Sequence, residues 1–293
     1  MAIMPIIQAT TIHAAQVRYL LHNGRHVYGS FGDEDLASLL TKGVALLGED
    51  QATPWGFLCI QVEERPVTLP STAPDRAYLR ALALERGRSP SQDVPLLMNL
   101  AQQQLNNPPR RRQLIVYGGE AWLIKPLFPL GFSLTERVQF FRLDLTRRVT
   151  DALVTTEVAQ LRPLHPPDLP ALAQLDAATF EPLWHFGEKE LWELLFRSRM
   201  QVALWEGKLV GYSAVTANGE EAHLARLAVH PAVQGLGIGR QLLIDSIAYA
   251  HEQQFTTVAL NTQVSNTRSQ RLYRQLGFRP TGLVLPVLTK TIP

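Results

Sequence analysis

The chain has 293 residues, of which 46% are hydrophobic and 18% are charged, and its net charge is +2. This composition is typical of a folded globular protein and excludes a disordered or collagen-like chain. The balanced charge gives no support for binding to nucleic acid or an acidic membrane, and a single cysteine excludes an internal disulfide framework. The length favours two domains.

The N-terminal residues show no basic stretch followed by an apolar core, so we expect no signal peptide. No apolar run approaches the roughly 18 residues of a membrane-spanning helix, and we expect a cytoplasmic protein. The eight histidines form no H-E-x-x-H motif and the single cysteine has no partner. We therefore expect no metal site.

In the N-terminal half, the residue pattern predicts strands at 54–64, 77–86 and 113–118 and a helix at 94–105. Residues 138–145 predict a further strand. The segment after them, at 146–156, is typical of a linker or a short helix, and we place the domain boundary between residues 148 and 149.

The C-terminal half alternates strands and helices more clearly. Strands are predicted at 158–164, 201–220 as a pair, 222–231, 256–263 and 282–292, and helices at 165–180, 187–199, 237–255 and 266–278. A tight turn at Glu206 and Gly207 joins the strand pair, and Gly277 is expected to end the last helix in the left-handed conformation. The order predicts an α/β (α+β) fold, a mixed, mostly antiparallel sheet with helices on both faces.

The two halves share a pattern of apolar residues at a fixed separation. When the sequence is shifted by 145 positions, the apolar residues coincide without a gap, as Leu79 does with Leu224 and Leu97 with Leu242. A Leu-Gly-Phe segment also recurs in the second half at an offset of 146. Such a repeat predicts two tandem copies of one fold.

A glycine-rich loop follows the strand predicted at 222–231. Backbone N–H groups at a helix N-terminus favour an anion and glycines allow its close approach, so the loop suits a pyrophosphate; a simple connecting turn is the alternative. A dinucleotide fingerprint needs G-x-G-x-x-G and a P-loop needs Gly-Lys-Ser/Thr, and neither pattern is present. The pattern Q/R-x-x-G-x-G/A is present at Gln234, Gly237 and Gly239.

With this loop the sequence resembles the GNAT superfamily of N-acetyltransferases, whose coenzyme A loop has the same pattern. A second segment typical of the family, NTRSQRLYRQLGF, occupies 266–278. The resemblance covers residues 158–293 and is strongest with the ribosomal-protein N-terminal acetyltransferases. It implies tandem GNAT-like domains, with an acetyl-CoA-dependent catalytic domain at 149–293.

The resemblance also implies roles for individual residues. The strand backbone at Leu227, Ala228 and Val229 would pair with the pantetheine amides, and Asn266 and Ser269 would complete the cofactor-binding set. The pyrophosphate loop comprises Gln234, Gly235, Leu236, Gly237, Ile238, Gly239 and Arg240. Tyr273 would be the general acid at the thioester sulfur, since a phenol with a reference pKa of about 10 is protonated at neutral pH and can donate to a departing thiolate; a tyrosine packed against the sheet is the alternative.

The general base departs from the pattern of the relatives. They place a carboxylate where this chain has Asn261, which cannot act as a base. Glu221 or Glu220 acting through water, or His223, could replace it, although all three also fit ordinary turn residues. Because an α-amine has a pKa near 8 against about 10.4 for lysine, we expect an α-amine or another weakly basic amine as acceptor.

Two aromatic residues, Phe180 and Trp184, fall in a region that borders the acceptor site in the family. They are candidate substrate contacts, together with His223 and Asn261. The alternative is that the two aromatic side chains cap the core.

The N-terminal copy has lost the loop. The equivalent residues, 89–95, contain no glycine, Pro90 and Pro95 remove backbone donors, and Asp93 brings a negative charge to the phosphate position. We expect residues 1–148 to form a degenerate GNAT-like domain that binds no coenzyme A, in a tandem arrangement resembling mycothiol synthase. The chain would be a monomeric pseudo-dimer or a homodimer that acetylates a small-molecule or peptide amine; the alternative is a non-catalytic acyl-CoA sensor.

Overall fold

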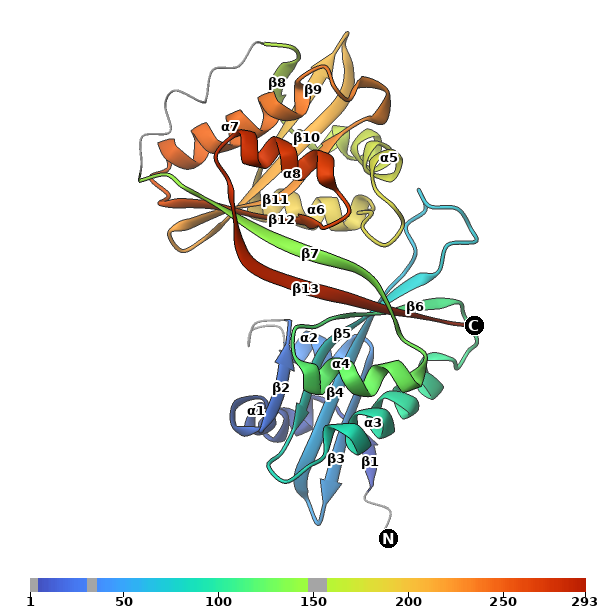
Figure 1. The fold of residues 1–293 in the computed structure, drawn as a ribbon. Helices are drawn as coiled ribbons and strands as arrows, with labels where there is room; N and C mark the ends of the chain where they lie inside the picture. Colours follow the sequence, from blue (N-terminus) through green and yellow to red (C-terminus); the bar gives the residue numbers. More distant parts are fainter. Residues whose placement is uncertain (1–4, 31–35, 147–156) are drawn as a thin grey trace. The chain divides into compact units, whose positions relative to one another are not determined.

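The computed structural model describes residues 5–30, 36–146 and 157–293. The chain divides into two compact units (Figure 1). Unit 1 comprises Met1–Arg65, Pro74–Glu136 and Leu285–Pro293, and unit 2 comprises Pro66–Ala73 and Arg137–Val284. The boundary predicted between residues 148 and 149 lies outside the described residues.

Unit 1 contains a sheet in the order β1-β3-β4-β5-β6-β13, with β2 paired to β5. Its strands are β1 Ile6–Gln8, β2 His26–Gly29, β3 Val44–Asp50, β4 Thr53–Glu63, β5 Asp75–Leu84, β6 Arg112–Tyr117 and the end of β13 Arg279–Ile292. Its helices are α1 Ala14–Asn23, α2 Leu36–Thr41, α3 Pro90–Leu105 and α4 Ala121–Ile124. Neighbouring strands are antiparallel except β5 and β6, which are parallel.

Unit 2 contains a sheet in the order β7-β12-β11-β10-β9-β8. Its strands are most of β7 Ser133–Asp144, β8 Gln160–Pro163, β9 Ser198–Trp205, β10 Lys208–Asn218, β11 Glu221–Val229 and β12 Thr257–Gln263. Its helices are α5 Leu169–Thr179, α6 Glu188–Arg197, α7 Ile238–Glu252 and α8 Thr267–Gln275. Here only β11 and β12 are parallel.

The two sheets have the same plan, as the predicted repeat requires. In each, four antiparallel strands are followed by one parallel pair and a final antiparallel strand. The irregularities of the two sheets also agree. The register shift between β4 and β5 leaves Arg80 without a partner residue in β4, and the shift between β10 and β11 leaves Ala225 without one in β10. These two positions are 145 residues apart, the offset of the repeat. The repeat therefore includes a β-bulge at the same position of both sheets.

The final strand of each sheet comes from the other half of the chain. Strand β7, green in Figure 1, ends the N-terminal half and pairs with β12 of unit 2. Strand β13, red in Figure 1, ends the C-terminal half and pairs with β6 of unit 1. The two copies have thus exchanged their last strands, which the repeat alone does not predict.

Helices cover both faces of the unit 2 sheet. On one face, α7 and α8 pack with β7, β11 and β12 around residues such as Leu243, Leu260 and Phe278. On the other, α5 and α6 pack with β9 and β10 around Leu172 and Leu191. The predicted turn is confirmed, since Glu206 and Gly207 have φ of 50° and 73°, as is Gly277, whose φ is 88°. No helix of the described ranges is long and apolar enough to cross a membrane.

Candidate active site

The central feature of unit 2 is a gap between two parallel strands. Strands β11 and β12 are paired from Glu221 and Thr257 up to Leu224 and Leu260, and the pairing ends there although both strands continue. The bulge at Ala225 lies where they separate. Backbone groups of β11 that face β12 beyond this point therefore have no partner strand and can bind a ligand.

The larger cavity of the site, of about 700 Å³, lies on the helix side of this gap. It is lined by Thr179, Phe180, Leu227, Val229, Val233, Gln234, Gly235, Gly237, Ile238, Gly239, Arg240, Asn266, Arg268, Ser269, Arg271, Leu272 and Gln275. Most of the predicted cofactor-binding residues are in this set. The predicted residues Ala228 and Leu236 do not line it: Ala228 is buried and Leu236 is half exposed.

The glycine loop has the conformation that the sequence pattern predicts. Gly235 and Gly237 have φ of 94° and 98°, a region that other residues rarely adopt. Gly237 is the N-cap of α7, so the N–H groups of the first helical turn begin directly at the loop. The side chain of Gln234 donates from Nε2 to the carbonyl of Val229 at 2.9 Å and fixes the start of the loop.

Three arginines give the larger cavity a positive charge. Arg240, Arg268 and Arg271 line it, and none of the described lining residues is acidic. Nη1 of Arg268 also donates to Oε1 of Gln234 at 2.7 Å, which connects α8 to the glycine loop. Arginines and helix N-terminal amides are the groups that bind phosphates, so this cavity fits the pyrophosphate of coenzyme A. Sequence reasoning missed Arg268 and Arg271, although their spacing of three places them on one side of α8.

A smaller cavity, of about 110 Å³, lies at the gap and shares Phe180, Leu227, Asn266 and Ser269 with the larger one. Its other lining residues are Val138, Trp184, Leu224, Ala225, Arg226, Asn261, Thr262, Gln263 and Tyr273. Phe180, Trp184 and Asn261 are thus brought together with Tyr273. None of the described residues that line this cavity is a carboxylate or a histidine.

Asn266 and Ser269 lie where the two cavities meet. Asn266 is the N-cap of α8, and its Oδ1 accepts from the backbone N–H of Ser269 at 3.1 Å. The amide nitrogen Nδ2 keeps its donors for a ligand, since no acceptor for it lies among the described residues. Asn266 therefore begins the helix that carries Tyr273 and lines both cavities.

Tyr273 is buried, and its ring packs against Phe141 and Phe278 with centroid distances of 6.0 Å each. Burial raises the pKa of Tyr273 to about 12, against a smaller lowering effect of the hydrogen bond with Ser269. The phenol is therefore protonated at neutral pH. Because this pKa exceeds the roughly 8.5 of a thiol, donation of a hydrogen bond to a thiolate is favoured over complete proton transfer.

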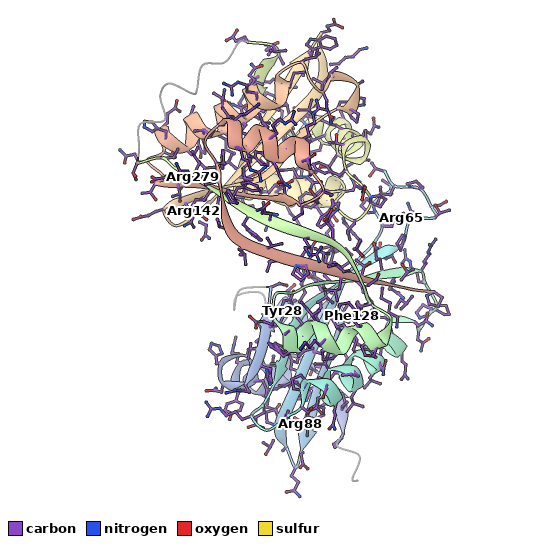
Figure 2. All side chains as sticks on the ribbon, viewed as in Figure 1. Tyr28, Arg65, Arg88, Phe128, Arg142 and Arg279 are labelled. Carbon is purple, nitrogen blue, oxygen red and sulfur yellow. The ribbon has the colours of Figure 1, made fainter. Side chains whose placement is uncertain are left out.

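The two remaining predicted residues, Glu221 and His223, lie at the paired end of β11 and line neither cavity. Oε2 of Glu221 accepts from Arg142 of β7, labelled in Figure 2, at 2.5 Å, and from the hydroxyl of Thr257 at 3.3 Å. Burial lowers the pKa of His223, with Glu221 opposing that effect. A role for either as a base stays a prediction.

A buried polar cluster behind the smaller cavity was not predicted. Asp176 of α5, His185, Tyr212 of β10 and Arg226 of β11 are joined by hydrogen bonds, and the side chains of Asp176 and His185 have no exposed surface. Burial would raise the pKa of Asp176, but the hydrogen bond from His185 and the charge of Arg226 hold it below its ordinary value. Two features of the sequence could have indicated this cluster. Arg226 is a charged residue within an apolar strand, and Asp176 is a charged residue on the apolar side of a helix.

In unit 1, the equivalent helix N-terminus is occupied by the chain itself. Helix α3 begins at Pro90 with Ser89 as N-cap, and Oδ2 of Asp93 accepts from the backbone N–H of Ser89 at 2.9 Å. Oδ1 of the same carboxylate accepts from Arg88, labelled in Figure 2. An internal carboxylate thus places a negative charge in the first turn of α3 and accepts from the N–H of its N-cap residue.

Residues 169–278 match the model of the acetyltransferase (GNAT) family. GNAT proteins generally use acetyl-CoA. The matched residues run from α5 to the Leu-Gly-Phe segment and include both motifs.

Relatives and solved structures agree with this assignment. The chain is 24% identical to a putative ribosomal protein bS18-alanine N-acetyltransferase of Bacillus subtilis over 43% of this chain and 83% of that protein. It is 32% identical to a mycothiol acetyltransferase of Acidothermus cellulolyticus over 26% of this chain and 28% of that protein. The chain spans less than half the length of several curated relatives that it matches.

A tandem GNAT protein from the clavulanic acid biosynthesis pathway, solved without AcCoA, has the same fold. Its TM-score is 0.68 at 16% identity, and the match covers 98% of both chains. Because the match covers 98% of this chain, the two tandem copies of one fold predicted from the sequence repeat are confirmed.

Proposed function

We propose that the chain is an N-acetyltransferase that transfers the acetyl group of acetyl-CoA to a weakly basic primary amine, with one working site in unit 2. The junction of the two cavities at Phe180, Leu227, Asn266 and Ser269 carries this proposal. It connects a positively charged cavity that fits a pyrophosphate to a small cavity that contains a tyrosine hydroxyl.

Each part of the site has a separate task. The loop at Gly235 and Gly237 and the three arginines would hold the pyrophosphate, and the unpaired backbone of β11 and Asn266 would hold the pantetheine arm. Bound acetyl-CoA would supply the acetyl thioester. Unpaired N–H groups at the Ala225 bulge would stabilise negative charge that develops on the acetyl oxygen, and Tyr273 would donate a hydrogen bond to the sulfur.

The class of acceptor follows from the absence of a base. None of the described residues lining the smaller cavity can take a proton from an ammonium group at neutral pH. An α-amine, with a pKa of about 8, is partly unprotonated there without help, whereas a lysine side chain, at about 10.4, is almost fully protonated. The site therefore suits α-amines and other weakly basic amines, from small molecules or peptides.

The test is a thiol-release assay with acetyl-CoA over a panel of amines, together with calorimetry of acetyl-CoA binding. We expect release with α-amines at pH 7 and little with lysine side-chain analogues. Tight binding without release on any amine would contradict the proposal and favour the alternative, an acyl-CoA sensor. Tyr273 in the lining of the smaller cavity favours the enzyme, because a sensor needs no such donor.

A further inference from the structure

Arg226 is the one charged residue among the described residues that line the smaller cavity. The carbon of its guanidinium lies over two aromatic rings, 3.7 Å from the ring centroid of Phe180 and 4.0 Å from that of Phe186. The N–H groups of a guanidinium lie in its plane, so its hydrogen bonds form along its edges. The rings therefore fix the plane in which Arg226 can contact a ligand.

Three of the five N–H groups of this guanidinium have partners. Nε donates to Oδ2 of Asp176 at 3.0 Å, and Nη2 donates to Oδ1 of Asp176 at 2.7 Å and to the carbonyl of Trp184 at 2.6 Å. No acceptor for Nη1 lies among the described residues. Nη1 is also not one of the fully enclosed polar atoms without a partner, and Arg226 lines the smaller cavity, so we take Nη1 as the donor available to a ligand there.

The carboxylate of Asp176 compensates the charge of Arg226. Asp176 also accepts from Nδ1 of His185 at 3.0 Å, from the backbone N–H of Phe186 at 2.7 Å and from the Tyr212 hydroxyl. The carboxylate is thus saturated with donors and cannot turn toward the cavity. Nη1 of Arg226 is therefore the group of this cluster that remains for a ligand. Its N–H donors suit an oxygen acceptor.

The cluster is connected to a loop that comes from the N-terminal half of the sequence. Residues 66–73 join β4 to β5 and belong to unit 2. In this loop the hydroxyl of Thr68 lies 2.6 Å from Nε2 of His185. Since Nδ1 of His185 donates to a carboxylate, Nε2 is the acceptor for Thr68. The contacts run from Thr68 through His185 and Asp176 to Arg226.

We propose that Nη1 of Arg226 binds a carbonyl or carboxylate oxygen of the acceptor, close to its amine, and that Asp176, His185 and Thr68 position Arg226 for this contact. The proposal rests on the proposed function, because it names the oxygen-bearing amine that the site would select. A carbonyl beside an amine also lowers the pKa of that amine, which agrees with a cavity that lacks a base. The cavity volume of about 110 Å³ is well above the ~10–15 Å³ that one water molecule requires on the same measure, so an amine and one neighbouring polar group can be accommodated.

The test compares glycinamide and glycine with propylamine, which is of similar size and lacks the oxygen. Rates are expressed per unprotonated amine, so that differences in amine pKa do not contribute. We expect kcat/KM for glycinamide or glycine to exceed that for propylamine about tenfold or more, as for one hydrogen bond to a charged donor. A preference for glycine indicates a free carboxylate as the group bound, and a preference for glycinamide indicates a peptide-like carbonyl.

Variants separate recognition from folding. Arg226→Met alone leaves Asp176 buried without its partner, so the double variant Arg226→Met/Asp176→Asn removes both charges. In either variant that binds acetyl-CoA with unchanged affinity, the preference for the oxygen-bearing amine should fall below threefold. Thr68→Val should raise KM for glycinamide severalfold and leave kcat and the KM for propylamine unchanged. Ser71→Ala, an exposed position on the same loop, is the matched control and should change neither.

Equal activity on glycinamide, glycine and propylamine in the wild type would overturn this inference and leave the proposed function standing. A preference that survives both Arg226 variants would overturn it as well. Absence of thiol release with every amine would contradict the proposed function instead. In that case, the affinities of glycinamide and propylamine for the coenzyme A complex, measured by calorimetry, test the Arg226 contact by itself. Tighter binding of glycinamide to the wild type that is lost in Arg226→Met supports the contact. Equal affinity of the wild type for the two amines overturns it.

Discussion

The buried ion pair of unit 2 allows a stability prediction with an internal control. Asp176 accepts five hydrogen bonds, two of them from Arg226, and its side chain is 0% exposed. Asp168 accepts two from Arg162, at 2.6 and 2.8 Å, and one from the backbone N–H of His165, but its side chain is 17% exposed. The two pairs have the same chemistry and differ mainly in burial.

Asp176→Asn keeps the shape of the side chain and removes its charge, so it leaves the Arg226 guanidinium buried and uncompensated. Removing one partner of a buried pair costs about 3–5 kcal/mol. For Asp168→Asn the corresponding cost is about 0–1 kcal/mol, because water solvates what remains. We therefore expect Asp176→Asn to lower the free energy of unfolding by at least ~2 kcal/mol more than Asp168→Asn.

Equilibrium urea unfolding followed by tryptophan fluorescence measures both variants on the transition of the same unit. A difference below ~1 kcal/mol would refute the argument that burial sets the strength of the Asp176 pair. The pH dependence gives a second check. Because the pKa of Asp176 is held below its ordinary value, its contribution to stability is complete above about pH 4 and is lost as the pH falls through the lowered pKa. In Asp176→Asn this part of the acid destabilisation should be absent.

Four further predictions concern the site. Tyr273→Phe should reduce kcat about 10²-fold with acetyl-CoA affinity nearly unchanged, and an unchanged kcat in the thiol-release assay would exclude its hydroxyl from the reaction. Gly237→Ala should weaken acetyl-CoA binding strongly in calorimetry, whereas Gly207→Ala, which also has a positive φ, should leave it intact; equal loss in both would indicate general strain. Glu221→Ala should retain activity within a few fold between pH 6 and 9, and a tenfold loss at the acid end would support Glu221 as a base acting through water. Calorimetry should give one acetyl-CoA per chain, and a second site would contradict the degeneration of unit 1.

Much of the fold could be predicted from the sequence, because its signals are local. The loop around Gly237 and the turn at Gly207 require a positive φ, and Asn266 is a typical N-cap, so each marks an element boundary whatever packs around it. The fixed offset of 145 likewise predicted two similar units. These features depend on a few neighbouring residues, and the structure contains them where they were expected.

The exchange of strands and the polar cluster could not be predicted in the same way. Strand β7 would satisfy its hydrogen bonds equally well in either sheet, so its sequence does not say that it pairs with β12. Asp176 and Arg226 are 50 positions apart, and each alone is only a charged residue in an apolar segment. Their partnership depends on how α5 packs against β10 and β11, which is determined by the tertiary fold.

The exchanged strands also affect how the protein can be divided. A cut in the 147–156 segment would yield two fragments, each with a sheet that ends on a bare parallel strand, β6 in one and β12 in the other. Each fragment would also carry a strand, β7 or β13, that has lost the partner strand it has in the whole chain. The halves should therefore be insoluble or self-associating when produced singly, and should reconstitute activity when produced together.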